Sequence, residues 1–222
     1  MAKQGRILGI GPTDNTSDQR TPRQALRQIP KNVRESFVPV VPARFATGPH
    51  EWDMTRTAPD RPRADGVPIE VTGTVRTQSG SPVRHALLEV WSANHYGRYR
   101  HVEDHSGLQL DENHFGMGRV LTDEDGNYRF WAISPGAYLA RPDIGRWRPK
   151  HIHMSISGGS SRLITQMYFP DEPNNITDPM AILMGDAFGR NIGKPRDSGD
   201  TDVDLAYDFD IVVGGRNATF FE

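Results

Sequence analysis

The sequence has no cysteine among its 222 residues, which excludes disulfide bonds, zinc–thiolate sites and cysteine-ligated iron–sulfur clusters. It also lacks a marked excess of either charge, with 26 basic against 28 acidic residues, so a general nucleic-acid-binding or membrane-binding surface is not indicated. No apolar run approaches the roughly 20 residues that a membrane-spanning helix needs. The apolar patch at residues 7–10 is too short for the core of a signal peptide. We therefore expect a cytoplasmic protein with no nucleic-acid or membrane partner.

The first 67 residues indicate an N-terminal arm rather than a domain with its own core. Residues 1–20 are polar and rich in glycine, aspartate and threonine. Thr21 followed by Pro22 is typical of the start of a helix, and Pro30 should end that short helix. Residues 38–67 are rich in proline and lack apolar periodicity, so we expect a long surface connection there.

The pattern changes after residue 67. Residues 69–75 alternate between apolar and polar side chains, as a half-buried strand does. Further apolar stretches follow, separated by glycine-rich and Asp-Gly turn signals. The expected strands cover residues 69–75, 86–91, 119–122, 128–133, 151–157, 163–169, 205–213 and 218–221. Short strands with little helix predict an all-β protein, with an antiparallel β-sandwich over residues 68–222 joined to the arm.

The most informative motif is the segment WRPKHIH at residues 147–153, which places His151 and His153 two residues apart. On a β-strand such residues share one face, with Cβ atoms roughly 6.5–7 Å apart, so both imidazoles can hold one metal ion. Two histidines alone do not define the chemistry. A zinc or ferrous site for hydrolysis would need a third histidine or a carboxylate as a further ligand.

Two tyrosines lie upstream of this motif in unusual settings. Tyr99 comes directly after an expected strand, and Tyr138 ends the turn-like segment PGAY at residues 135–138. Their spacing places both of them, like His151 and His153, near the ends of consecutive strands. The four side chains are therefore candidates for a common site.

Several ordered motifs resemble the intradiol ring-cleavage dioxygenases. They are RYRH at residues 98–101, LTD followed by DG at residues 121–126, PGAY at residues 135–138, WRPKHIH at residues 147–153 and LITQ at residues 163–166. The resemblance also includes residues 22–26 and 205–212, so it covers nearly the whole chain. Within the family, the chain is most similar to the iron-bearing β chains that act on protocatechuate.

This resemblance implies a non-haem Fe(III) ion held by Tyr99, Tyr138, His151 and His153, together with a solvent hydroxide. The donor chemistry agrees, because phenolate oxygens are hard anionic ligands that suit a trivalent cation and imidazole also suits iron. A bound cation favours the ionised phenol. Two phenolates and one hydroxide would balance the 3+ charge, in contrast to the two-histidine, one-carboxylate site of ferrous oxygenases.

The resemblance also implies a reaction, in which O₂ cleaves a catechol between its two hydroxylated carbons to give a cis,cis-muconate. Tyr138 occupies the position of the more labile tyrosine, which would act as an internal base. Arg148 would stabilise negative charge on the substrate, with a surface salt bridge as the alternative role. Gln166 would hydrogen-bond Arg148 or the reacting oxygen, with an ordinary cross-strand contact as the alternative.

Three further residues are expected to contact the substrate, namely Trp147, Ala140 and Met180. Ala140 stands where the family's β chains usually carry tryptophan, so a large wall of the pocket is missing. We expect a substituted catechol such as protocatechuate, which would give 3-carboxy-cis,cis-muconate. The other candidates are 4-sulfocatechol, hydroxyquinol and a chlorinated or alkylated catechol.

The resemblance leaves two alternatives for assembly and one for function. Iron-bearing chains of this size usually pair with a homologous α subunit that lacks iron, but a homo-oligomer is the second alternative. The alternative function is that of a non-catalytic β-sandwich binding subunit. Family subunits of that kind lack the set of iron ligands, whereas this chain keeps all four.

Overall fold

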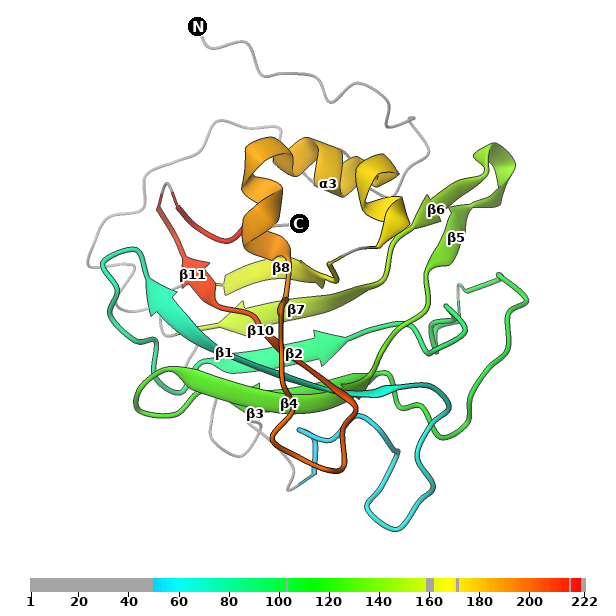
Figure 1. Ribbon diagram of the computed structural model, residues 1–222, viewed down its shortest axis with the longest axis horizontal. Helices are drawn as coiled ribbons and strands as arrows, with labels where there is room; N and C mark the ends of the chain where they lie inside the picture. Colours follow the sequence, from blue (N-terminus) through cyan, green and yellow to red (C-terminus); the bar gives the residue numbers. More distant parts are fainter. Residues whose placement is uncertain (1–49, 103, 159–161, 171, 216, 221–222) are drawn as a thin grey trace, which may run out of the picture.

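The computed structural model describes residues 50–220, apart from residues 103, 159–161, 171 and 216, and it contains two β-sheets packed against each other (Figure 1). The first sheet contains β1 (Pro68–Thr77), β4 (Asn127–Ile133), β9 (Lys194–Arg196), β10 (Leu205–Asp208) and β11 (Ile211–Val213). The second contains β3 (Met117–Leu121), β2 (Leu87–Trp91), β7 (His151–Ser157) and β8 (Arg162–Tyr168), in that spatial order. The predicted all-β sandwich is confirmed, and its first strand begins at Pro68.

The hydrophobic core lies between the two sheets because the strands alternate their side chains. Ile69 and Val71 of β1 and Phe130 of β4 enter it from one sheet, and Ile152 and Met154 of β7 enter it from the other. Burying one such side chain stabilises the fold by about 1.5–3 kcal/mol. The alternation that buries these residues also turns their neighbours in the sequence to the opposite face of each sheet.

The outer face of the four-stranded sheet therefore receives His151 and His153. Trp91 of β2 pairs with His153 across the sheet. On the other side of β7, Tyr168 of β8 pairs with His151 and Gln166 pairs with His153. One end of this outer face thus collects aromatic and polar side chains, and all of those named are buried outside the main core except Trp91, which is half-buried.

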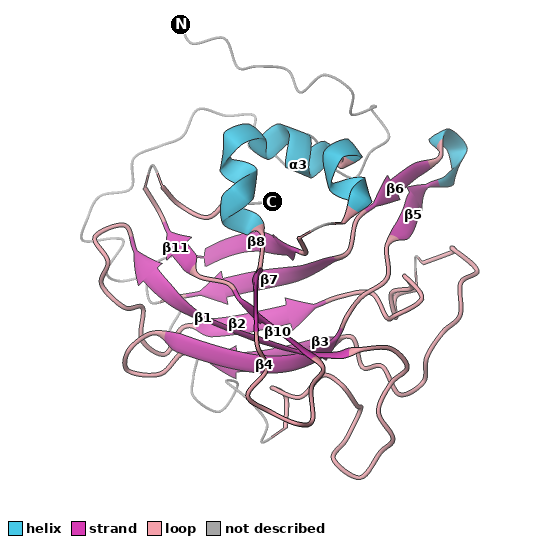
Figure 2. Cartoon of the chain, viewed as in Figure 1, coloured by secondary structure: helices cyan, strands magenta, loops and turns pink. Residues whose placement is uncertain are grey.

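Several elements cover that end of the sheet. A hairpin formed by β5 (Tyr138–Arg141) and β6 (Arg146–Arg148) contains the 3₁₀ turn η2 (Pro142–Ile144). Three helical segments come after β8 in the chain, namely η3 (Pro173–Thr177), α3 (Pro179–Met184) and η4 (Gly185–Asn191). They lie above β8 in the view of Figure 2. The turn η4 packs on β8 of the sandwich, and η3 packs on β6 of the hairpin. None of these elements was predicted from the sequence.

Details of the first sheet also differ from expectation. β10 and β11 pair with successive stretches of β1 in parallel, whereas β4 pairs with β1 in the antiparallel sense. The strand expected over residues 205–213 is divided at residues 209–210, and residues 218–220 lie outside the strands, although Thr219 hydrogen-bonds Val212. The helix expected to start at Pro22 lies outside the described residues.

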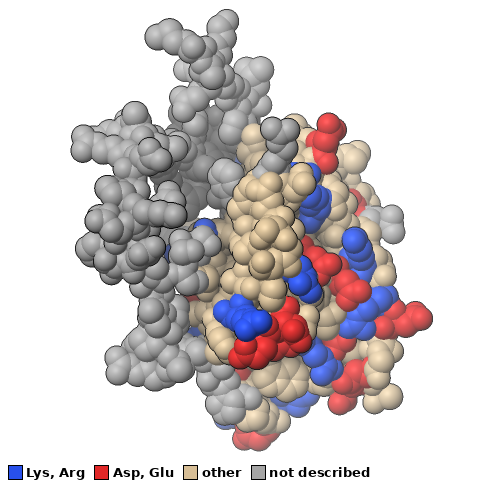
Figure 3. Space-filling view, turned by 90° about the vertical axis from the view of Figure 1, so that its left-hand side faces the viewer, with Lys and Arg blue, Asp and Glu red and all other residues tan. Residues whose placement is uncertain are grey.

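The surface carries both charges. On the face shown in Figure 3, basic and acidic side chains are interspersed over the part of the chain that the structure describes. Within the same described residues, no helix has the length and apolar composition needed to cross a bilayer.

Candidate metal centre

His151 and His153 point to a common position on the outer face of β7. Their side chains are almost fully buried, with 2% and 8% of each residue exposed. Their Nε2 atoms are 3.1 Å apart, and their rings are inclined at 75°. Two nitrogens that each lie about 2.1 Å from one ion, at roughly a right angle, are about 3.0 Å apart. The observed separation therefore fits two ligands of one metal ion.

The surroundings of the two imidazoles favour their ligating form. Nδ1 of His151 lies 2.7 Å from the carbonyl oxygen of Pro149, which can only accept, so Nδ1 donates and Nε2 keeps its lone pair. Burial, and then the positive charge of Arg148 and the presence of His153, hold the pKa of His151 well below its usual range. The indole of Trp91 stacks in parallel on the imidazole of His153, with centroids 5.0 Å apart. Both imidazoles are thus held in fixed orientations.

Two turns bring the tyrosines to the same place. One, at residues 94–98, is organised by Asn94, whose side chain accepts hydrogen bonds from the amides of Tyr96 and Arg98. The other contains Gly136, whose amide donates to the carbonyl of Asn94 at 2.9 Å. A Cβ atom on Gly97 would lie 2.4 Å from the Ala137 carbonyl oxygen. Glycine is therefore needed for the two turns to touch.

The phenol rings meet beside the histidines as a result. Tyr99 and Tyr138 make an edge-to-face contact with centroids 5.3 Å apart and an 89° angle. Tyr99 lies 6.2 Å from His153, and Tyr138 lies 5.7 Å from His151, both between ring centroids. Burial raises the pKa of Tyr138, while the charge of Arg148 and hydrogen bonds from Tyr99 and Arg148 act in the opposite direction. The structure thus brings together all four side chains that the sequence singled out.

The set of donor atoms fits a ferric ion better than it fits a zinc ion. Among the residues that the structure describes, no cluster of three or more His, Cys, Asp or Glu side chains is placed to hold a metal ion. The side chains that accompany His151 and His153 are instead the phenols of Tyr99 and Tyr138. Hard oxygen donors together with imidazoles suit a ferric ion.

Comparisons with known proteins agree with this arrangement. The family model described as Dioxygenase matches residues 40–215. The protocatechuate 3,4-dioxygenase beta chain of Burkholderia cepacia is 40% identical over 218 residues, which cover 96% of this chain and 92% of the relative. The chain belongs to the intradiol ring-cleaving dioxygenases.

Other relatives of this dioxygenase share its sandwich. The chlorocatechol 1,2-dioxygenase of Rhodococcus opacus is 35% identical over 130 residues, which cover 53% of this chain and 49% of that protein. Among solved structures, the catechol 1,2-dioxygenase of Acinetobacter sp. ADP1 superposes with a TM-score of 0.55 at 27% identity, over 72% of this chain and 55% of the other. The resemblance to the intradiol dioxygenases, which the sequence motifs indicated, is confirmed. That family generally depends on non-haem iron.

In this dioxygenase, Arg148 is held in a dense network beside Tyr138, its partner across the β5–β6 hairpin. Its Nε donates to Asp178 at 2.8 Å, and its Nη2 donates to the Gln166 side-chain oxygen at 2.6 Å and to the Tyr168 hydroxyl at 3.0 Å. Burial acts to lower the pKa of Arg148, but the neighbouring tyrosines and the Asp178 carboxylate raise it overall. Arg148 is thus a permanent cation and is only 14% exposed.

Two members of this network were missed in the sequence. Tyr168 follows Gln166 by two residues on β8, so strand alternation alone places both on one face. Asp178 precedes Pro179, and an aspartate followed by proline is a typical start of a helix. Both signals were present, but neither shows which other segment the side chain would meet.

A cleft of about 480 Å³ opens over the two phenol rings. Its walls comprise Trp91, Gly97, Tyr99, His101, Asp104, His105, Ser106, Tyr138, Leu139 and Ala140. Ala140, expected near the substrate, lines this cleft. Trp147 and Met180, also expected near the substrate, do not line it: Trp147 is on β6, 46% exposed and paired with Leu139, and Met180 is in the first turn of α3.

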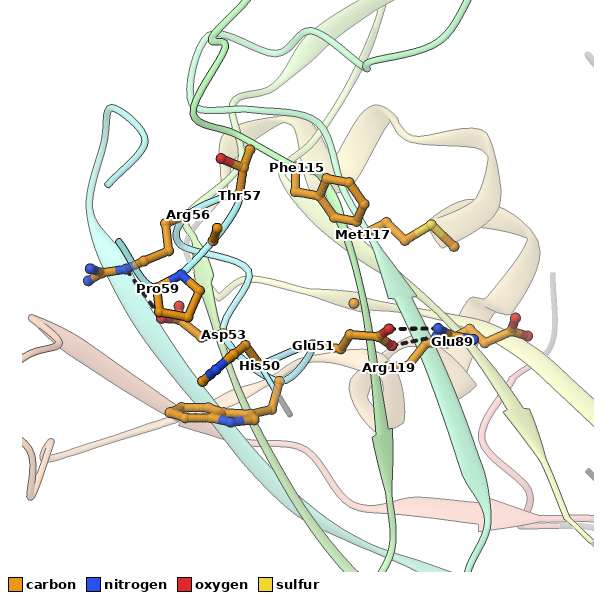
Figure 4. Close-up of a pocket in the computed structure, with 13 residues that line it drawn as sticks. His50, Glu51, Asp53, Arg56, Thr57, Pro59, Glu89, Phe115, Met117 and Arg119 are labelled. Atoms are coloured by element: carbon orange, nitrogen blue, oxygen red, sulfur yellow. Dashed lines mark hydrogen bonds and ion pairs between the residues drawn. The ribbon is translucent and has the colours of Figure 1, made fainter. Parts of the chain in front are cut away.

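A separate hollow of about 580 Å³ lies beside β3 (Figure 4). It is bounded by residues 50–59 and by β3, and Arg119 donates two hydrogen bonds to Glu51 there at 2.5 and 2.6 Å. Because Tyr99 and Tyr138 line the first cleft and not this hollow, the cleft is the one of the two that adjoins the candidate metal centre.

Proposed function

We propose that this dioxygenase cleaves a catechol between its two hydroxylated carbons, using O₂ and a ferric ion held by Tyr99, Tyr138, His151 and His153, to give a cis,cis-muconate. The observation that carries the proposal is the convergence of two phenols and two imidazoles beside one cleft. Membership of the intradiol family supports the same reaction.

When bound, a ferric ion would supply Lewis acidity and would be able to accept one electron. Both properties activate a catechol toward O₂. The protein supplies the charge balance. Two phenolates reduce the formal charge of the site from 3+ to 1+, and His151 and His153 add neutral donors. The hydrogen bond from His151 to the Pro149 carbonyl keeps the Nε2 lone pair available for the ion.

The residues around the ion handle protons and developing charge. The phenolate oxygen of Tyr138 accepts a proton from a catechol hydroxyl, and the positive charge of Arg148 eases the return of Tyr138 to the ionised state. Arg148 also stabilises negative charge that develops on the substrate ring, since it is a fixed and largely buried cation. Gln166 holds the guanidinium through its side-chain oxygen.

The cleft supports a substituted catechol as the substrate. Its volume of about 480 Å³ is typical of small-molecule pockets, and Ala140 leaves space where a larger residue would stand. Protocatechuate, giving 3-carboxy-cis,cis-muconate, is the first candidate because the relative from Burkholderia cepacia is named for it. The alternatives are 4-sulfocatechol, hydroxyquinol and a chlorinated or alkylated catechol, and named relatives act on chlorocatechol and hydroxyquinol.

We also propose that the chain works in an oligomer. The relative is named a beta chain, which supports a homologous α subunit as the partner, with a homo-oligomer as the alternative. The candidate ligands all come from one chain, so iron loading does not require the partner. The rival function, a non-catalytic binding subunit, predicts a protein that does not bind ferric iron.

The experiment is a visible absorption spectrum of the purified protein with its iron quantified, before and after anaerobic addition of protocatechuate. We expect a broad tyrosinate-to-iron charge-transfer band that shifts when the catechol is added. A band that protocatechuate leaves unchanged would redirect the search to another catechol or to a missing α subunit. A colourless protein that cannot be loaded with ferric iron would refute the proposal.

A further inference from the structure

We propose that Asp178 is a positioning residue for catalysis, whose carboxylate fixes the Arg148 guanidinium beside Tyr138 with one oxygen and starts helix α3 with the other. The inference rests on the proposed function, because it assigns Arg148 to the reaction. It adds a residue that lies thirty positions further along the chain and in a different element.

The first half of the evidence is the ion pair. The Oδ2 atom of Asp178 accepts from Nε of Arg148 at 2.8 Å, and the Asp178 side chain is completely buried. Arg148 also hydrogen-bonds the Gln166 amide oxygen and the Tyr168 hydroxyl, which are neutral, and the phenol oxygen of Tyr138. Asp178 is therefore the carboxylate that helps to compensate a cation held away from water.

The second half is the helix cap. The Oδ1 atom of Asp178 accepts from the backbone amides of Met180 at 2.7 Å and Ala181 at 3.2 Å. These are amides of the first turn of α3, which have no partner within the helix, and Pro179 occupies the first helical position. Each carboxylate oxygen thus has its own task, and the position of α3 is tied to that of the guanidinium.

The geometry explains why the guanidinium has one orientation. Nε is held by Asp178 on one side, while Nη2 is held by Gln166 and Tyr168 on another, so the planar group cannot rotate without breaking bonds on both. Tyr168 in turn donates to the Gln166 oxygen at 2.8 Å, which completes the triangle. A guanidinium released from Asp178 would lose the bond that fixes Nε and would shift relative to Tyr138 and the substrate.

The two tasks can be separated by substitution. Asparagine is as good a helix cap as aspartate, but it is uncharged, and its amide would meet the N–H of Arg148 when its oxygen caps the helix. Glutamate keeps the negative charge but is a poorer cap because its chain is longer. A positioning role predicts the activity order Asp, then Glu, then Asn, whereas a role limited to capping predicts the order Asp and Asn, then Glu.

The test compares Asp178→Asn and Asp178→Glu with the wild-type holoenzyme, measuring kcat and KM per bound iron, melting temperature and the charge-transfer band. We expect Asp178→Asn to keep its iron and its cooperative unfolding, to lose at least about tenfold in kcat, and to show a displaced band because the charge beside Tyr138 has moved. Asp178→Glu should recover part of the kcat despite a lower melting temperature. Asp202→Asn is the matched control, since it changes an exposed Asp–Arg pair with Arg63 and should alter neither property.

Two results would overturn the inference: a kcat of Asp178→Asn within twofold of wild type, or activities that follow the order of the melting temperatures. If Asp178→Glu does not fold, the Asn variant decides alone, through its kcat per iron and its band. A wild-type protein with no iron band and no catechol turnover would refute the proposed function instead, and that outcome is visible before any variant is made.

Discussion

The Nε2 atoms of His151 and His153 lie 3.1 Å apart, although both imidazoles are buried. Because Nδ1 of His151 donates to the Pro149 carbonyl, the Nε2 of His151 carries a lone pair. The Nε2 of His153 must then either donate a hydrogen to it or share a cation with it. A shared cation would satisfy both rings at once, and the two phenols stand where they can complete its coordination.

The first prediction concerns the histidines. His153→Ala should lower the iron content of the purified protein at least about tenfold, because it removes one ligand and the stacking partner of Trp91. Iron per chain, measured by mass spectrometry of the metal, checks this. His85→Asn is the control: His85 is exposed, pairs with Glu124 and has a positive φ of 52°, which asparagine tolerates. A His153→Ala protein with full iron occupancy would contradict the assignment.

The second prediction concerns the phenols. Tyr99→Phe and Tyr138→Phe should each weaken and displace the visible absorption band, since each removes one oxygen that transfers charge to the metal. Tyr96→Phe should leave the band unchanged, because the Tyr96 hydroxyl donates to Asp65 at 2.8 Å and is not one of the candidate ligands. The measurement is the spectrum per bound iron. If the spectra of all three variants were the same, Tyr99 and Tyr138 would not be ligands of the metal.

The third prediction concerns the size of the cleft. Ala140→Trp should reduce kcat/KM for a substituted catechol relative to unsubstituted catechol by about tenfold or more, because the indole would fill space in the cleft that Ala140 lines. The ratio of the two kcat/KM values removes any general loss of activity. Ile176→Trp adds the same group at an 83% exposed position and should leave the ratio unchanged. An unaltered ratio in Ala140→Trp would indicate that the substituent of the catechol binds in another part of the site.

The fourth prediction concerns stability in acid. Burial acts to raise the pKa of Glu70, but hydrogen bonds from Arg196 and Arg129 outweigh it and hold the pKa below its usual value. The stabilisation is therefore fully present above the pKa of the unfolded chain, near pH 4–5, and is lost as the pH falls through the lower folded value. Glu70→Gln should lower the stability at pH 7 by on the order of 1–3 kcal/mol and flatten the decline of the melting temperature below about pH 5.

Glu124→Gln is the control for this prediction. Glu124 is 69% exposed and pairs with Arg84 at 3.5 Å on the surface, where an ion pair contributes little. Its substitution should leave the acid profile almost unchanged. If both variants follow the wild-type profile, the network around Glu70 does not contribute to acid stability.

Much of the fold follows from local patterns. Alternation of apolar and polar residues predicted the strand that became β1, and apolar stretches between turn signals predicted those that became β2, β3, β4, β7 and β8. The two-residue period of a strand placed His151 and His153 on one face. The β5–β6 hairpin escaped prediction, since its strands are short and half-exposed and its formation depends on packing against the rest of the chain.

The candidate ligands of the centre were indicated by the sequence itself. The absence of cysteine excludes thiolate ligands, the spacing of His151 and His153 indicates two imidazoles on one face, and the family resemblance implies that Tyr99 and Tyr138 complete the set. Tertiary structure decided what surrounds them. Asp178 reaches Arg148 only because η3, which directly precedes it, packs on β6, and Gly97 meets Ala137 only because two turns touch. Such contacts join residues distant in sequence, and their formation depends on how the whole chain packs, which no local pattern records.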